Sequence, residues 1–116
     1  MSDDCLFCRI AGGEIPARVV HETPTTLAFR DISPKAPLHV LVIPKEHHAD
    51  VAALAEADPA LAGEVLATAA VVAKAEGMLM GGYRTIFNTG RYAGQDVFHA
   101  HAHLIGGGPL GPMVCG

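Results

Sequence analysis

The chain has 116 residues, of which 50% are hydrophobic and 17% charged, a composition that supports one domain with an apolar core and excludes an intrinsically disordered chain. Its net charge is −4 with eight lysines and arginines, so it lacks the basic surface that binds nucleic acids. No segment approaches the ~20 apolar residues of a membrane span, and the first ten residues lack the basic and apolar regions of a signal peptide. We therefore expect a cytoplasmic protein with no membrane partner, whose residues 1–116 form a single domain.

The predicted elements start with a short helix over residues 5–11, because two glycines follow the run CLFCRIA. Five runs rich in β-branched or apolar residues, bounded by Gly, Pro, Asp or Ser, predict strands at 17–22, 26–31, 38–43, 82–89 and 97–105. Between the third and fourth runs, the alanine-rich residues 52–77 predict the main helix, with Asp58 as its N-cap, Pro59 at its first position and Gly77 at its end. Short connections favour antiparallel pairing of the first three strands, and the long helix must cover one face of the sheet. The predicted class is α+β.

The last predicted strand contains HAHAHLI, in which His99, His101 and His103 occupy every second position. Successive side chains of a strand point to opposite faces, so the three imidazoles should share one face. The alternate residues should share the face on which the long helix packs, where the small alanines allow a close approach: Phe98, Ala100, Ala102 and Leu104.

Three interpretations of this histidine row compete. An exposed polar face fits poorly, because threonine, lysine or glutamate would serve equally well there. Three neutral imidazoles with a water molecule could instead form a catalytic zinc site. The third interpretation is direct histidine chemistry, in which one imidazole attacks an electrophile while its neighbours orient it and move protons. Glycine-rich segments flank the row at residues 88–97 and 106–113, and their amides could bind a phosphate, which favours phosphoryl or nucleotidyl transfer.

The chain resembles the histidine triad (HIT) superfamily and, within it, the Hint branch of nucleoside phosphoramidases. HAHAHLI is similar to the His-x-His-x-His signature, and AFRDISPKAPLHVLVIPKEH, NTG, GQDVFHAHAHLIGG and PLGPM resemble the Hint blocks in order and spacing. The resemblance implies a two-layer fold, with a five-stranded antiparallel sheet, one long helix and a short N-terminal helix. It also implies a homodimer that joins two sheets, and no cofactor required for catalysis. The implied reaction is hydrolysis of the phosphorus–nitrogen bond of adenosine (purine nucleoside) 5′-phosphoramidates through a nucleotidyl-histidine. Alternatives are a dinucleoside polyphosphate hydrolase and a non-catalytic nucleotide-binding regulatory protein.

The resemblance also implies roles for individual residues. His101 would be the nucleophile, His103 would contact the phosphate or the leaving group, and His99 would support the site. Asp31 would bind the ribose, since one carboxylate can accept from both sugar hydroxyls; without the resemblance it is a turn residue. The remaining residues of an AMP-like nucleotide site would be Phe7, Phe29, Ile32, Asn88, Gly94, Gln95 and Val97, with Ile10 beside the apolar ones. The alternative interpretation of the apolar members is ordinary core.

The cysteines allow two further interpretations. Cys5, Cys8 and Cys115 should be reduced in a cytoplasmic protein. The Cys5-x-x-Cys8 pair could be two small buried thiols, or, as the resemblance to some bacterial members implies, part of a structural zinc site completed by His47 and His99.

Two residues depart from a simple transfer of the family pattern. Asp96 stands where the best-known members have a serine that touches phosphate. A carboxylate there would repel phosphate, and its alternative partner is the amine of a cationic leaving group. His39 matches a common family position but lies in a predicted strand, and we expect a structural role for it.

Overall fold

The computed structural model describes residues 4–114, so Cys115 and its expected reduced state lie outside the described residues. The elements in chain order are α1 (Leu6–Ala11), β1 (Val19–Glu22), β2 (Thr26–Arg30), β3 (Leu38–Pro44), α2 (Val51–Ala57), α3 (Pro59–Ala75), β4 (Tyr83–Phe87), the short 3-10 helix η1 (Arg91–Ala93) and β5 (Ala102–Gly106). No helix in this part of the chain is long and apolar enough to cross a membrane.

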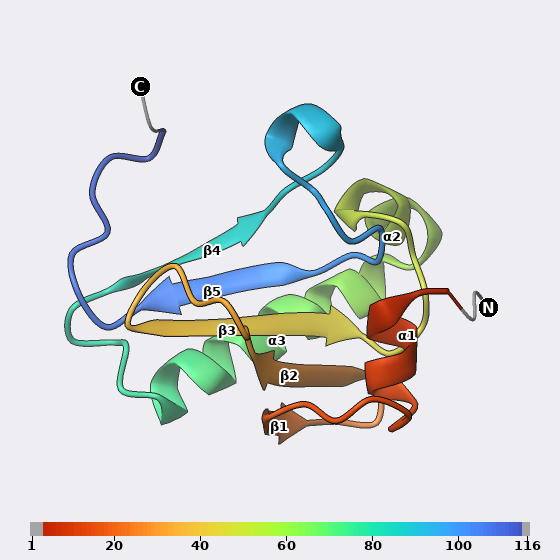
Figure 1. Cartoon of the computed structure of the whole chain (residues 1–116), viewed down its shortest axis with the longest axis horizontal. Helices are drawn as coiled ribbons and strands as arrows, with labels where there is room; N and C mark the ends of the chain where they lie inside the picture. The colour runs from red at the N-terminus through yellow and green to blue at the C-terminus, as the bar shows by residue number, and fades with distance from the viewer. Residues whose placement is uncertain (1–3, 115–116) are drawn as a thin grey trace.

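The strands form one five-stranded sheet in the order β1-β2-β3-β5-β4, and all neighbouring pairs are antiparallel (Figure 1). The last strand is inserted between β3 and β4, where His103 pairs with Leu41 on one side and Ile86 on the other. The predicted antiparallel α+β fold is thus confirmed, and the end of the histidine row lies in the interior of the sheet rather than at an edge.

The long helix α3 covers one face of the sheet, as predicted (Figure 1). The core on this side buries Val65, Ala69 and Val72 of the helix against Val40 and Leu104 of the sheet. Burial of such apolar side chains from water supplies most of the favourable free energy of folding.

The predicted N-cap Asp58 and first-position Pro59 of the main helix are confirmed, but the residues before Asp58 form a separate helix, α2, that was not predicted. Asp58 ends α2 with non-helical backbone angles (φ −152°, ψ 79°), and its carboxylate caps α3 by accepting from the Leu61 N–H at 3.0 Å. Pro59 then takes the first helical position, where a missing N–H costs nothing. Helix α2 has its own N-cap, Asp50, whose side chain accepts from the Ala53 N–H. The predicted end of the main helix is confirmed, because Gly77 follows the C-terminus of α3 with φ +76°.

Helix α1 packs on the opposite face, in front of one end of the sheet in Figure 1. Its Phe7 is buried against Leu27, Phe29, Leu41 and Ile43 in a second core cluster. The two faces of the sheet therefore have separate cores, a large one under α3 and a smaller one under α1.

The predicted strand over 97–105 starts later than expected, at Ala102. Extending the β3–β5 register would place Pro44, which has no N–H, opposite Ala100. The N–H of Ala100 instead donates to the His48 carbonyl at 2.7 Å, which ties this segment to the loop after β3. Phe98 was expected on the helix face, but it precedes the regular pairing and is 53% exposed.

Candidate active site

The three histidines of the row lie on the α1 side of the sheet and contact one another or the Phe7 ring. The ring centroids of His101 and His103 are 5.0 Å apart, and Phe7 lies 5.1 Å from His101 and 6.0 Å from His99. His99 and His101 are buried and His103 is half-buried. The shared face predicted from strand periodicity therefore holds, although two of the three histidines precede the regular strand.

His101 has one ring nitrogen anchored and one open. Its Nδ1 lies 2.8 Å from the carbonyl oxygen of His99, and because a carbonyl only accepts, Nδ1 donates. In the neutral ring, Nε2 then carries the lone pair. Nε2 of His101 has no hydrogen-bond partner among residues 4–114. Every fully buried side-chain nitrogen or oxygen in these residues does have a partner, so Nε2 must be accessible at the surface. The geometry suits a nucleophile at Nε2.

His103 contacts a histidine of the neighbouring strand. Its Nδ1 lies 2.9 Å from Nε2 of His39, whose Nδ1 accepts from the Lys35 N–H at 3.0 Å. Burial lowers the pKa of His103 to about 4, and it also lowers the pKa of His39. The Asp31 carboxylate lies 3.4 Å from His39 Nε2, so the predicted ribose-binding acid and the end of the histidine row are joined through one imidazole.

His99 turns to a different group, in which Cys5, Cys8, His47 and His99 bring one ligand atom each within 4.8 Å of one another. The Nδ1 atoms of His47 and His99 are 3.2 Å apart, and the sulfur–nitrogen distances are 3.4 Å (Cys5–His99), 3.3 Å (Cys8–His47) and 3.5 Å (Cys8–His99). In a tetrahedral zinc site with bonds of ~2.3 Å to sulfur and ~2.05 Å to nitrogen, a sulfur and a nitrogen ligand would lie about 3.5 Å apart, and two nitrogen ligands about 3.3 Å apart. The four residues therefore fit the ion in number, type and spacing.

The protonation states of this group also bear on metal binding. His99 Nε2 donates to the Pro44 carbonyl at 2.8 Å, which leaves its Nδ1 lone pair facing the cysteines. Burial lowers the pKa of His99 to about 4, so its ring is neutral, as a metal ligand must be. Burial also raises the pKa of the Cys8 thiol to about 11, with a further contribution from Cys5, so a bound cation would have to displace a proton there.

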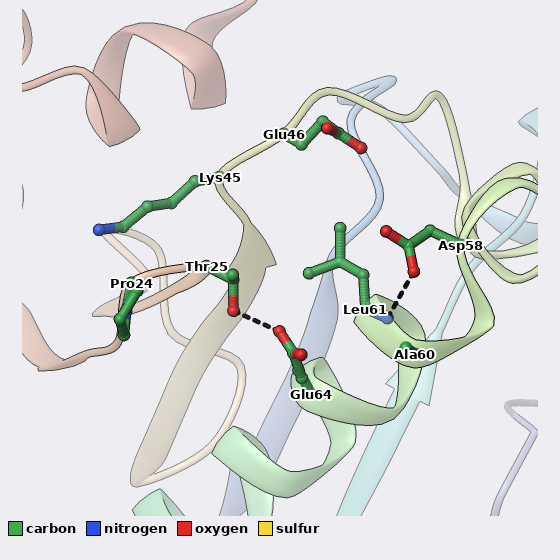
Figure 2. A pocket seen from close by; sticks show the side chains of 8 residues that line it. All are labelled: Pro24, Thr25, Lys45, Glu46, Asp58, Ala60, Leu61 and Glu64. Atoms are coloured by element: carbon green, nitrogen blue, oxygen red, sulfur yellow. Dashed lines mark hydrogen bonds between the residues drawn. The ribbon is translucent and has the colours of Figure 1, made fainter.

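A hollow elsewhere on the surface does not have this chemistry. It lies between the loop before β2, the end of β3 and the start of α3 (Figure 2), and it is lined by Pro24, Thr25, Lys45, Glu46, Asp58, Ala60, Leu61 and Glu64. Three carboxylates surround its one lysine, and the Lys45 ammonium already pairs with Glu22 at 2.6 Å. Such a surface would repel phosphate, and no predicted site residue lines it.

Comparison with known proteins agrees with the geometry. The sequence model of the HIT domain matches residues 12–110. The chain belongs to the HIT domain family. This HIT protein is 42% identical over 114 residues to the purine nucleoside phosphoramidase of Escherichia coli (strain K12), a match that covers 98% of this chain and 96% of that relative.

Solved structures of HIT proteins share the whole fold. A HIT family hydrolase from Clostridium thermocellum superposes with a TM-score of 0.93 at 41% identity and covers 99% of this chain and 100% of its own. A histidine triad protein from Clostridium difficile gives a TM-score of 0.93 at 36% identity, covering 98% of this chain and 99% of that one. The family and fold expected from the sequence blocks are thereby confirmed, and this HIT protein is a hydrolase of the family.

The structure places the predicted nucleotide-binding residues of this HIT protein in two environments. Phe7 and Phe29 are 4% and 3% exposed and meet edge to face at 5.6 Å, so they form part of the α1-side core beneath the histidines. Ile32 is 97% exposed beside Asp31, whose Oδ1 accepts from the Ser33 N–H. The part of these side chains in an AMP-like nucleotide site stays a prediction.

The loop before the histidine row is held by Gln95, which was predicted to belong to the nucleotide site. Its Oε1 accepts from the Gly90 N–H at 2.9 Å, and its Nε2 donates to the carbonyls of Ala49 and Val97. All of its amide hydrogens are therefore used within the protein, and Gln95 fixes the loop rather than presenting free donors. Gly94 has the left-handed backbone (φ +90°) that ends η1. Of the other residues considered, Asn88 and Val97 are half-buried and Ile10 borders the α1-side core, whereas Asp96 is exposed.

The sequence interpretation missed the contact between His39 and His103. These residues are 64 positions apart, and only the β3–β5 register, in which Leu41 faces His103, brings them together. The available signal was a histidine at a family position in a strand next to the predicted row.

Proposed function

We propose that this protein hydrolyses the phosphorus–nitrogen bond of purine nucleoside 5′-phosphoramidates, releasing an amine and the nucleoside monophosphate. The observation that carries the proposal is the state of His101, whose Nδ1 is anchored on a carbonyl while Nε2 is open. The similarity to the Escherichia coli purine nucleoside phosphoramidase over 98% of the chain supports the choice of substrate.

The proposed reaction has two displacements at phosphorus. Nε2 of His101 attacks the α-phosphorus, the phosphorus–nitrogen bond breaks, and the leaving nitrogen takes up a proton to depart as an amine. Water then attacks the nucleotidyl-histidine, the bond between phosphorus and His101 breaks, and the proton of the water balances the one taken by the amine. His103, 5.0 Å away between ring centroids, would contact the phosphate oxygens, and Asp31 would accept from the ribose hydroxyls.

The test is turnover of an adenosine 5′-phosphoramidate with a fluorescent amine as leaving group, with diadenosine polyphosphates as competing substrates. We expect release of amine and AMP, and a rapid quench followed by mass spectrometry should find the nucleotide on the peptide that carries His101. Stronger cleavage of diadenosine polyphosphates would overturn the proposal. Thermal stabilisation by AMP with no turnover of either class would identify a binding protein instead.

We propose also that Cys5, Cys8, His47 and His99 hold a structural zinc ion. When bound, the ion would be closed off by four protein ligands and would join α1 to the end of β3 and to the segment before β5. His101 lies outside the ligand set, so catalysis would not require the ion. Metal analysis of protein purified without chelator should give about one zinc ion per chain, and a metal-free protein of equal thermal stability would contradict the proposal.

The homodimer implied by the family resemblance is likewise our proposal. Within the described residues β4 pairs with β5 alone, so its other edge is free to pair with a second chain. Sedimentation or light scattering should give twice the monomer mass, and a monomer at micromolar concentration would contradict it.

A further inference from the structure

The contact between His39 and His103 fixes where the protons of both rings lie. The Lys35 backbone N–H can only donate, so His39 Nδ1, 3.0 Å away, must accept. A neutral imidazole carries one ring proton, and that of His39 is therefore on Nε2. His39 Nε2 lies 2.9 Å from His103 Nδ1 and donates to it, which leaves the single proton of His103 on Nε2.

This proton count applies only if both rings are neutral, and their surroundings make them so. His39 is 5% exposed and His103 is half-buried, and desolvation is the first cause that lowers the pKa of each. Asp31 opposes the shift at both rings and Asp96 opposes it at His103, whereas His101 adds to it at His103 and Lys35 adds to it at His39. The balance still lies on the neutral side.

We propose that His39 is a positioning residue that holds His103 as the Nε2–H tautomer. The backbone N–H of Lys35 sets this arrangement, because it donates to Nδ1 of His39 and so places the proton of His39 on Nε2. Nε2 of His103 has no protein partner and, within residues 4–114, no buried side-chain nitrogen lacks one, so this N–H faces the open side. The consequence for catalysis rests on the proposed function. A phosphate oxygen would meet a donor at His103, whereas the other tautomer would present a lone pair to an anion.

Another interpretation of the same residues is a second metal site, since Asp31, His39 and His103 also place one ligand atom each within 4.8 Å of one another. The Lys35 contact argues against it. With Nδ1 of His39 occupied and its Nε2 protonated, this ring offers no lone pair to a cation. The hydrogen-bonded relay accounts for all three ring nitrogens involved.

Two substitutions test the contacts of the two His39 ring nitrogens one at a time. In His39→Asn the side-chain oxygen can occupy the position of Nδ1 and accept from Lys35, but the side chain is too short to reach His103. In His39→Gln the amide nitrogen can occupy the position of Nε2 and donate to His103, while the contact with Lys35 is lost. A residue that only fills space would tolerate both equally.

The experiment is a two-bond proton–nitrogen correlation spectrum of protein labelled with ¹⁵N-histidine, with His103 assigned by the signals missing from His103→Gln. We expect His103 to be protonated at Nε2 in the wild type and in His39→Gln, and to show a mixture of tautomers in His39→Asn. In the phosphoramidate assay kcat should fall about 10-fold in His39→Asn, with KM little changed, and should be largely retained in His39→Gln. His21→Asn, on β1, is the matched control and should change neither measurement.

The spectrum requires no substrate, so the relay and the proposed activity can fail independently. Protonation of His103 at Nδ1 in the wild type would overturn the relay, even if neither variant folds. An unchanged His103 tautomer and unchanged kcat in folded His39→Asn would overturn the role of His39. A protein with the expected tautomer but no phosphoramidase activity would keep the relay and refute the proposed function.

Discussion

The histidines at the two ends of the row, His99 and His103, differ in what their ring nitrogens contact. At the His99 end, one nitrogen donates to the Pro44 carbonyl and the other faces two cysteines and His47 in a set of potential metal ligands. At the His103 end, one nitrogen accepts from His39 and the other is open. His101 lies between them with its open nitrogen available for attack. Three residues of one type, at every second position, thus have different chemical states because the backbone and neighbouring side chains differ.

This comparison predicts that stability and activity depend on opposite ends of the row. A group with four ligand atoms and no free position suits a structural ion, whereas an open N–H beside an open lone pair suits chemistry on a bound substrate. The predictions that follow are ordered from the largest expected effect to the smallest.

Substitution of His101 by alanine should give the largest loss of activity and a small change in stability. The variant loses the proposed nucleophile, so we expect kcat/KM for an adenosine phosphoramidate to fall by about 10³-fold or more. The measurement is amine release together with a thermal melt. His21→Ala, which changes a histidine of β1, is the control and should retain full turnover. Turnover in His101→Ala close to that of the wild type would refute nucleophilic attack by this residue.

Substitution of Cys8 by serine should lower stability and leave activity nearly unchanged, the opposite of the result expected for His101→Ala. Loss of one ligand of the proposed zinc site should lower the melting temperature by about 10 °C, as a loss of ~2–3 kcal/mol does in a domain of this size. Because His101 does not belong to the ligand set, kcat measured well below the melting temperature should stay within about twofold. A chelator should lower the wild-type melting temperature and leave that of Cys8→Ser nearly unchanged. If the chelator abolished activity at a temperature where the fold persists, a catalytic metal would replace this interpretation.

Much of the His99–His103 arrangement could be predicted from the sequence, for reasons that are local. A period of two placed the three imidazoles on one face, and Ala100 and Ala102 do lie buried on the α3 side as predicted. The cap at Asp58 was predicted correctly, but the separate helix α2 before it was not, because the alanine-rich pattern continues through Asp58. Residues that cap a helix can also separate two helices, and sequence pattern alone does not distinguish these cases.

Other features depend on contacts between segments far apart in the chain. The β3–β5 pairing ends at Val42 and Ala102, two residues before an extended register would place Pro44 opposite Ala100, and no local property of residues 97–101 indicates this late start of β5. The His39–His103 contact likewise requires β5 to insert between β3 and β4, which strand prediction does not specify. The possible zinc ligands were expected from family resemblance, and their convergence depends on how α1 packs.

Substitution of Asp31 by asparagine should affect substrate recognition at the open end of the row. The amide keeps an acceptor for the Ser33 N–H but loses the charge that would accept from two ribose hydroxyls. We expect kcat/KM to fall about 10-fold, or ~1.4 kcal/mol of binding in the transition state, with little change in melting temperature. A substrate lacking both ribose hydroxyls should show a much smaller difference between wild type and variant. An equal loss for both substrates would assign Asp31 to the orientation of His39 instead of the sugar.

At neutral pH the smallest expected effect is that of His103 titration, which changes stability only when the pH falls below about 6.5. Its pKa is about 4 in the folded chain and near 6.5 in the unfolded chain, so the unfolded state binds more protons between these values. The stabilisation from the neutral ring is therefore fully present above pH 6.5 and is lost as the pH falls towards 4. Urea unfolding of wild type and His103→Gln at several pH values between 4 and 7 measures this, and the variant should lose less stability on acidification. The comparison cancels any proton-driven release of metal at the His99 end, which both proteins share. Parallel curves for the two proteins would show that His103 has the same pKa in the folded and unfolded states. The His103 ring would then be as well hydrated in the folded protein as in the unfolded chain.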